Sequence, residues 1–173
     1  MDISIVPMTR ELMHEMYKDF QFDPDIFDDM ELYENKKNYI YDEKKVDFLF
    51  DMRSSEENSH AFAVMLGGEI IGEVGLRHAG PETGECELSV HLKNDQVKNL
   101  GYGTEAERLA VKYAFDELHM DRIFAESLIK NTRSQHVLMK VGFSYTGEED
   151  GFKQYLLKKE DWEKMSGHSA SDR

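Results

Sequence analysis

Two kinds of hydrophobic periodicity run along this chain. In some segments apolar and polar side chains alternate, as in strands with one buried face, and in others apolar residues recur every three or four positions, as in helices packed on one side. The alternating segments predict strands at residues 3–6, 60–66, 69–77, 85–92, 122–129, 143–146 and 152–158. The helical spacing predicts helices at residues 11–17, 42–53 and 131–141, and one more that carries the stripe Ala106, Leu109, Ala110, Tyr113 and Ala114. A turn followed by a short helix is expected within residues 20–30.

Turn residues and helix caps join these elements into an α+β plan. Gly67-Gly68 lies between two strand patterns and is a strong hairpin signal, and a third strand follows, so an antiparallel meander is expected. Thr104 and Glu107 have the spacing of a capping box at the start of their helix. The remaining strands alternate with helices, which predicts a mixed, mostly antiparallel sheet of six to seven strands flanked by helices.

Length and residue usage favour one compact domain. The 173 residues, 40% of them hydrophobic, suffice for a full core, and the domain is predicted to span residues 1–166. Residues 167–173 are rich in Ser and Asp and are expected to form a disordered tail. A single cysteine, Cys86, excludes an internal disulfide, and the seven histidines show no ligand spacing, so no metal site is predicted.

The charge balance bears on partners and location. With 35 acidic and 21 basic residues the net charge is −14, which argues against a nucleic-acid partner and either favours a cationic one or serves solubility alone. The N-terminus has no signal-peptide pattern, and no apolar run approaches the length that spans a membrane. A cytoplasmic protein without membrane contact is therefore expected, as a monomer or a homodimer.

The segment Lys98-Asn99-Leu100-Gly101-Tyr102-Gly103 is the first candidate binding site. It follows a predicted strand and opens directly into a predicted helix. Its two glycines let the backbone approach a ligand closely, and the N–H groups at a helix start attract anions. This loop therefore predicts a phosphate cradle, although two glycines at this spacing also occur in ordinary tight turns.

A second motif, together with the loop, resembles a known protein family. Residues 131–143 run from Asn131 through Ser134 to Gly142-Phe143. Together with residues 87–103 this segment resembles the GNAT superfamily of acetyl-CoA-dependent N-acetyltransferases, most closely the branch of the ribosomal-protein N-terminal acetyltransferases. The family loop has Gln or Arg, two free positions, Gly, one free position, then Gly or Ala, and here Lys98 departs from it while keeping the positive charge.

The resemblance implies the fold and the donor. In the GNAT fold two neighbouring parallel strands, here residues 85–92 and 122–129, splay apart, and the pantetheine arm of acetyl-CoA lies between them. The implied cofactor-binding residues are His91, Leu92, Lys93, Lys98, Asn99, Leu100, Gly101, Tyr102, Gly103, Thr104 and Asn131. Lys93, Lys98, Arg108 and Lys112 are expected to form a basic patch near the phosphates, or else part of a solvated helix face.

Acetyl transfer to a protonated amine needs a general base, and two glutamates are candidates. Glu87 precedes Gly101 by 14 residues and Glu126 precedes Asn131 by 5 residues, spacings at which different branches of the family carry their base. Strand alternation places Glu87, Ser89 and His91 on one face, so Glu87 is the first choice and His91 a further candidate. Either glutamate could instead be an ordinary exposed strand residue.

The leaving thiolate has no obvious proton donor. Many relatives carry a tyrosine four residues before the glycine of the Gly-Phe pair, where this chain has Leu138. Ser134 is the nearest replacement, matching the serine of the N-terminal acetyltransferase branch. Cys86 is expected in the core, because alternation points it away from Glu87 and nothing activates it.

The acceptor amine is left open. The carboxylate-rich segment 20–34 could receive a polyamine, an aminoglycoside or a peptide N-terminus, or could be a solvated acidic face. A second hypothesis is an acyl-CoA-binding sensor or scaffold that keeps the fold but lacks turnover, which the missing tyrosine and Lys98 favour. A nucleotide-binding regulator is disfavoured, because the loop lacks the P-loop pattern.

Overall fold

A computed structural model of the protein describes residues 2–23, 26 and 39–167. Within these residues seven strands form one sheet in the order β1-β2-β3-β4-β5-β7-β6. The strands are β1 (Ile3–Pro7), β2 (His60–Leu66), β3 (Glu69–Gly80), β4 (Glu85–Leu92), β5 (Arg122–Leu128), β6 (Ser144–Glu149) and β7 (Phe152–Lys158). The helices are α1 (Arg10–Lys18), α3 (Glu43–Ser54), α4 (Tyr102–Asp116), α5 (Thr132–Val141) and α6 (Lys159–Ser166), with a short 3₁₀ helix, η2, at Asp95–Val97.

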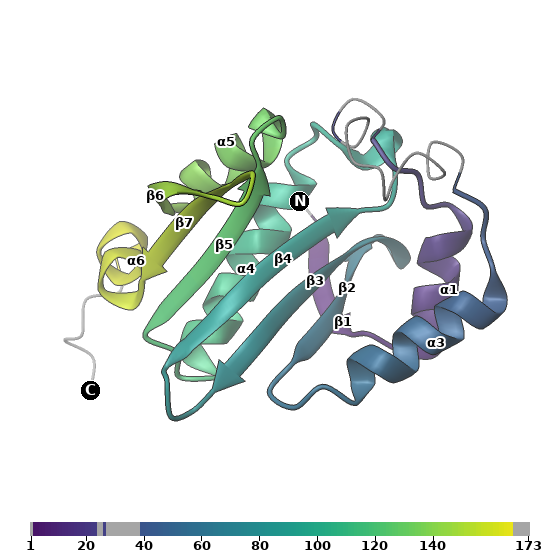
Figure 1. Ribbon diagram of the computed structural model, residues 1–173, viewed down its shortest axis with the longest axis horizontal. Helices are drawn as coiled ribbons and strands as arrows, with labels where there is room; N and C mark the ends of the chain where they lie inside the picture. The colour runs from purple at the N-terminus through teal and green to yellow at the C-terminus, as the bar shows by residue number, and fades with distance from the viewer. Residues whose placement is uncertain (1, 24–25, 27–38, 168–173) are drawn as a thin grey trace.

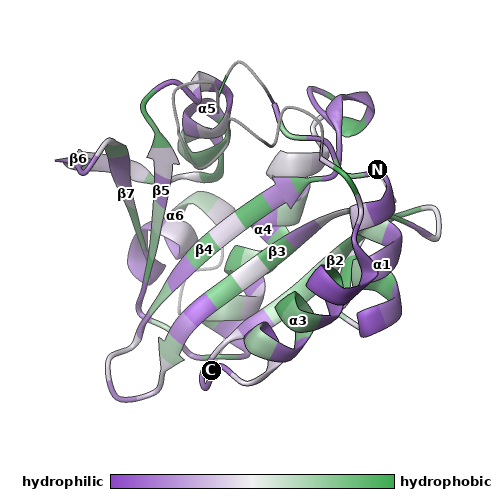
Figure 2. Ribbon diagram, turned by 45° about the vertical axis from the view of Figure 1, so that its right-hand side comes forward, coloured by the Kyte–Doolittle hydropathy of each residue, from purple (hydrophilic) through white to green (hydrophobic). Residues whose placement is uncertain are grey.

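Helices cover both faces of the sheet (Figure 1). The main core lies between the sheet and α4, where Phe62, Val64 and Leu76 meet Ala110 and Ala114, residues of the predicted helical stripe. A smaller core lies on the other face, where Met16 of α1 packs with Ala63 and Ile70. Alternation along β2 therefore sends successive side chains to opposite cores, and hydrophobic segments lie on both sides of the sheet (Figure 2).

The predicted meander is confirmed. β2, β3 and β4 pair antiparallel, and Gly67 and Gly68 close the first hairpin with φ values of +57° and +90°, as a type I′ turn requires. β3 extends three residues beyond its predicted end, to Gly80. The alternation predicted for β4 also holds at Cys86 and Leu88, which are buried while Glu87 and Ser89 are half-buried.

β4 and β5 are the parallel pair that positions the site. They pair only from Glu85 to Glu87 on one strand and from Arg122 to Phe124 on the other. Beyond these residues the strands diverge (Figure 1), while β4 remains paired with β3, and β5 with β7. The facing edges of β4 and β5 therefore have backbone N–H and C=O groups without a partner strand.

Two local features differ from the sequence predictions. The N-cap of α4 is Gly101, so Thr104 lies inside the helix and the expected capping box is absent. Both Thr104 and Glu107 are buried instead. A final helix, α6, was not predicted, and its Trp162 packs against the main core. Most of residues 20–30, where a short helix is expected, and the tail from residue 168 on lie outside the described residues.

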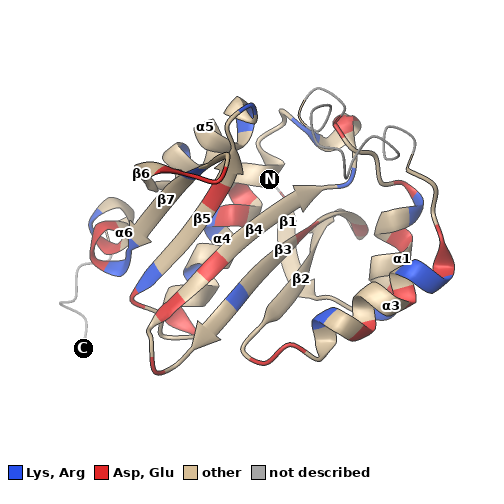
Figure 3. Ribbon diagram, viewed as in Figure 1, with Lys and Arg blue, Asp and Glu red and all other residues tan. Residues whose placement is uncertain are grey.

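Acidic side chains are spread over helices, strands and loops rather than collected on one element (Figure 3). None of the helices in the described residues is long and apolar enough to cross a membrane.

Candidate functional site

A cavity of about 460 Å³ opens beside the part of β4 that lies beyond its pairing with β5, and we call it the gap cavity. Residues from β4, α4 and α5 line it together with aromatic residues that follow α1. Its lining includes Phe20, Phe22, Ile26, Val90, His91, Leu92, Lys98, Gly103, Glu107, Asn131, Ser134 and Val137. The end of β4 thus borders a space that is shared by the glycine loop and the start of α5.

The N-terminus of α4 faces this cavity and suits an anion. Gly101, its N-cap, has a left-handed conformation with φ of +84°, and Asn99 also has a positive φ, of +61°. Gly101 makes no side-chain cap hydrogen bond, so no capping side chain occupies the first N–H groups of the helix. These groups and the helix dipole together form an electropositive surface at the cavity edge.

The loop before α4 is held by its own contacts. The Asn94 side chain donates to the carbonyl of Asp19 and accepts from the N–H of Gln96, and the Lys98 ammonium group contacts Asp95 at 2.8 Å. The backbone of Lys93 is also engaged, because its N–H donates to Ile71 and its carbonyl accepts from Gln21. Lys93, one of the expected cofactor-binding residues, therefore has both of its backbone groups already paired.

Asn131 is fixed at the opposite wall. It is the N-cap of α5, where its Oδ1 accepts from the N–H of Ser134 at 3.1 Å. Its carbonyl accepts from the Ser127 hydroxyl at 3.3 Å. The Gln135 amide donates to the carbonyls of Leu128 and Ile129, each at 2.9 Å, and so ties α5 to the end of β5. These bonds orient the first turn of α5 toward the gap cavity.

Glu107 contributes an unusual group to the cavity. Its side chain is 5% exposed, and its Oε2 has no hydrogen-bond partner within the described structure. Burial disfavours the charged form and raises the pKa of Glu107 to about 8. The carboxyl group is therefore mostly neutral near pH 7 and can donate a hydrogen bond.

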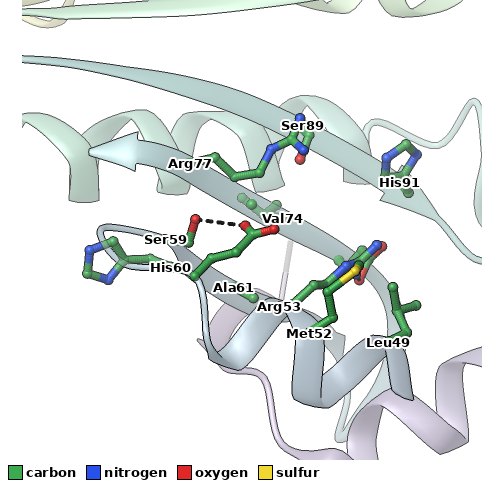
Figure 4. Close-up of a pocket in the computed structure, with 13 residues that line it drawn as sticks. Leu49, Met52, Arg53, Ser59, His60, Ala61, Val74, Arg77, Ser89 and His91 are labelled. Atoms are coloured by element: carbon green, nitrogen blue, oxygen red, sulfur yellow. Dashed lines mark hydrogen bonds and ion pairs between the residues drawn. The ribbon is translucent and has the colours of Figure 1, made fainter. Parts of the chain in front are cut away.

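A second cavity, of about 240 Å³, lies between α3 and strands β2 to β4, and we call it the α3 cavity. Leu49, Met52 and Arg53 of α3 face Ser89 and His91 of β4 across it (Figure 4). Arg53, Glu73 and His91 line both this cavity and the gap cavity. The two cavities therefore share a wall.

The shared wall is built around the carboxylate of Glu73. The Arg53 guanidinium donates to its Oε2 at 2.7 Å, and the Tyr17 hydroxyl approaches its Oε1 at 3.4 Å. Glu73 is buried. The burial of Tyr17 itself, together with the negative charge of Glu73, raises the pKa of the Tyr17 hydroxyl. Tyr17 thus stays neutral as a hydrogen-bond donor.

His91 projects from β4 at this wall, opposite Glu73 in the β3–β4 register. Its side chain reaches solvent, yet the cleft around it removes enough water to lower its pKa below the usual 6.5. Arg53 and Arg77 lower the pKa further, while Glu73 opposes them. The ring is therefore neutral near pH 7 and has a nitrogen able to accept a proton.

A third cavity, of about 370 Å³, contains both predicted glutamates, at the end of the sheet where β4 and β5 are still paired. Glu87 accepts from Arg77 at 2.9 Å, and Glu126 accepts from Gln154 at 3.2 Å. Cys86 is buried nearby, and burial raises the pKa of its thiol to about 12, as suits a core residue. Glu87 and Glu126 thus lie together, but neither lines the cavity that contains Asn131.

Some of the predicted residues line the gap cavity, Glu87 and Glu126 line the third cavity, and the others line neither: Lys93, Asn99, Leu100, Gly101, Tyr102 and Thr104. His91, Leu92, Lys98, Gly103, Asn131 and Ser134 meet at the gap cavity. Each lysine or arginine of the expected basic patch has an acidic neighbour within 4.0 Å or less: Asp19 for Lys93, Asp95 for Lys98, Glu105 for Arg108 and Asp116 for Lys112. The cationic groups of the expected patch are thus each engaged by a neighbouring carboxylate.

Sequence reasoning missed several residues of the site. Tyr17, Arg53, Glu73 and Glu107 come from four different elements. One sign was available, since Glu107 lies beside Ala106 on the apolar stripe of its helix, where a charged residue is out of place. Among the described residues, no cluster of three or more His, Cys, Asp or Glu side chains is arranged to hold a metal ion.

Comparison with known sequences identifies relatives of this chain. Residues 3–144 match the family model of the acetyltransferase (GNAT) domain. Spermidine N(1)-acetyltransferase of Escherichia coli (strain K12) is 26% identical over 100 residues, which cover 58% of this chain and 53% of that protein. An N-acetyltransferase 9-like protein of Nematostella vectensis is 24% identical over 128 residues, covering 73% of this chain and 63% of that protein. The chain thus aligns with little more than half the length of these curated relatives.

Solved structures share the fold. Spermidine N-acetyltransferase from Vibrio cholerae, in complex with CoA and spermine, superposes with a TM-score of 0.71 at 14% identity, covering 92% of this chain and 97% of that one. The aminoglycoside acetyltransferase AAC(6')-Ib, in complex with coenzyme A, gives a TM-score of 0.75 at 17% identity and covers 95% of this chain and 99% of that one. At these identities the likeness establishes the fold and not the substrate.

Proposed function

Because the chain belongs to the GNAT acetyltransferase family, we propose that it transfers the acetyl group of acetyl-CoA to a primary amine. The observation that carries this proposal is the gap cavity. It joins the edge of β4 that is free of β5 to the uncapped start of α4 and to Asn131. A phosphate-bearing, amide-bearing donor needs these groups together.

The residues present fit the donor. Backbone N–H groups from Asn99 to Gly103 suit its pyrophosphate, and the unpaired edges of β4 and β5 suit the amides of its pantetheine arm. Asn131 would orient the arm from the opposite wall. When bound, acetyl-CoA supplies the activated thioester.

We propose that the acceptor enters through the α3 cavity, because this cavity shares a wall with the gap cavity. The apolar side chains of Leu49 and Met52 suit a carbon chain, and Glu56 adds a carboxylate at the same cavity. The acceptor classes we propose are a polyamine, an aminoglycoside and a peptide N-terminus. The names of the E. coli and V. cholerae relatives include a polyamine, and that of AAC(6')-Ib includes an aminoglycoside. The carboxylate-rich segment 20–34 lies largely outside the described residues.

A general base must take a proton from the acceptor ammonium, directly or through water. Glu87 and Glu126 are the bases proposed from sequence spacing, and Ser134 would contact the leaving sulfur. The position of His91 favours it over both glutamates, because its ring lies at the wall where donor and acceptor cavities meet. The carboxylate of Glu87 is already engaged by Arg77.

Acetyl-CoA binding measured by calorimetry, beside CoA release with spermidine, spermine, kanamycin and a peptide with a free N-terminus, tests the proposal. Expected results are binding and amine-dependent release. Loss of release in H91N, or in the E87Q/E126Q double variant, identifies the base, and E69Q, which removes an exposed carboxylate of the β2–β3 hairpin, is the matched control. Binding without release for every amine would instead support the acyl-CoA sensor, and absence of binding would exclude both.

A further inference from the structure

Glu107 is poorly explained by folding alone. Its side chain lies on the buried face of α4 beside Ala106 and Ala110, and Oε2 has no partner within the described structure. A buried polar group without a hydrogen bond destabilises the folded state, and leucine would suit the same helix face better. A residue that costs stability at a cavity wall is often retained because a ligand completes its bonds.

The position of Glu107 defines which part of a ligand it would meet. Glu107 lies two turns or less into α4, beyond the N–H groups that suit phosphate. It lines the gap cavity with Val90 of β4 and with Ser134 and Val137 of α5. These residues place Glu107 between β4 and α5, where an elongated ligand held by its phosphates at the helix start would extend.

We propose that Glu107 binds the pantetheine arm of acetyl-CoA, with its neutral carboxyl group donating a hydrogen bond to an amide carbonyl of the arm. This inference rests on the proposed function and adds a binding residue to it. An amide is the matching partner, because a carboxylic acid donates through O–H and accepts through C=O. The arm would satisfy Oε2, which no protein group in the described structure does.

Other titratable groups face the same cavity and must be separated from Glu107 in any pH experiment. From the elements packed around the cavity these are Tyr17, Asp23, Arg53, Glu73, His91, Lys98 and Arg133. A comparison of the wild type with E107Q isolates Glu107, because the remaining groups are common to both proteins.

Direct binding to two ligands tests the inference. The ligands are acetyl-CoA and adenosine bisphosphate, the portion of coenzyme A that lacks the arm. E107L is expected to weaken acetyl-CoA binding about tenfold, the effect of one lost hydrogen bond in a closed site, and to leave the adenosine bisphosphate Kd unchanged. E107Q keeps a donor and an acceptor and is expected to bind acetyl-CoA within about threefold of the wild type. D116N, which removes an exposed carboxylate at the other end of α4, is the control.

The pH dependence of binding provides a readout that simple packing would not produce. Between pH 7 and pH 9 the wild type is expected to lose about tenfold in acetyl-CoA affinity relative to E107Q, because only the protonated carboxyl group donates. Calorimetry at the two pH values measures this.

Equal acetyl-CoA binding by E107L and wild type, or an E107Q profile parallel to the wild type from pH 7 to pH 9, would overturn the role of Glu107 while leaving the proposed function intact. A wild type that binds no acetyl-CoA would overturn the proposed function and this inference together. If E107L does not fold, the E107Q pH profile alone decides.

Discussion

Arg53 and Glu73 form a 2.7 Å ion pair that joins α3 to β3 at the wall between the gap cavity and the α3 cavity. The Glu73 side chain is 8% exposed and that of Arg53 33% exposed, so the pair is partly shielded from water. Breaking it from one side would leave a buried carboxylate without its counterion.

R53M is therefore expected to lower the free energy of unfolding by about 3 kcal/mol, because Glu73 loses its partner. The double variant R53M/E73Q should recover most of this loss, since neither charge is then left alone. Urea denaturation of R53M, E73Q and the double variant measures the coupling between the two side chains. Additive losses would show that the pair contributes nothing beyond its separate side chains.

The left-handed conformation of Gly101 gives a second prediction. G101A is expected to cost about 1 kcal/mol of stability, because its φ of +84° is unfavourable for a residue with a Cβ atom. It should also weaken acetyl-CoA binding by altering the start of α4. G151A is a matched control, because Gly151 has φ of +85°, has open space around it and lies in the β6–β7 turn. If G101A and G151A bind acetyl-CoA with equal affinity, the conformation of Gly101 does not contribute to acetyl-CoA binding.

The buried carboxyl of Glu107 predicts how stability varies with pH. Its folded-state pKa of about 8 lies above the ordinary 4.5, so its contribution is fully present below pH 4.5 and is lost as the pH rises through 8. Between pH 4.5 and pH 8 and above, the free energy of unfolding of the wild type is expected to fall by up to about 5 kcal/mol relative to that of E107Q. Denaturation curves at pH 5 and pH 8 for wild type and E107Q test it, and parallel changes in both proteins would contradict it.

A neutral His91 predicts the pH profile of catalysis. Because cleft burial and the neighbouring arginines keep its pKa below 6.5, kcat/KM should hold at neutral pH and fall only at more acidic values, where the ring gains a proton. H91N should reduce kcat at least about 100-fold. H119N changes an exposed histidine after α4 and should behave as wild type. If the acidic limb of the kcat/KM profile is unchanged in H91N, another residue is the general base.

Glu56 tests the route of the acceptor. Its carboxylate lines the α3 cavity and accepts from the Ser59 hydroxyl at 3.2 Å. E56Q is expected to raise KM for spermidine about threefold with little change in kcat, since an exposed carboxylate attracts a cation only weakly. E57Q alters the adjacent exposed carboxylate, which does not line the cavity, and steady-state kinetics of both variants should separate them. Identical KM values would place the acceptor elsewhere.

Local chemistry made much of this architecture predictable from the sequence. Gly67-Gly68 fixed a hairpin, alternation fixed the buried face of β4, and Asn131 and Gly142 marked both ends of α5. These signals depend on neighbours in sequence, which a single chain reveals.

The site was less predictable because its walls come from distant segments. The Arg53–Glu73 pair and the contact of Tyr17 with it depend on how α1 and α3 pack on β3, which periodicity does not specify. Thr104 was misjudged for a local reason, because the left-handed Gly101 is the N-cap and the helix begins three residues earlier than the capping-box spacing predicts. Whether Glu87 or Glu126 acts in catalysis stays a prediction.

The short β4–β5 pairing has a mechanical consequence. Only three residue pairs connect strands β1 to β4 with strands β5 to β7, so the sheet is two panels joined along a brief seam. A ligand whose arm bonds to both free edges would act as an additional strand across that seam. Backbone amides of β5 and the last residues of β4 would then exchange with solvent more slowly in the complex, and the two panels would open and unfold as one unit.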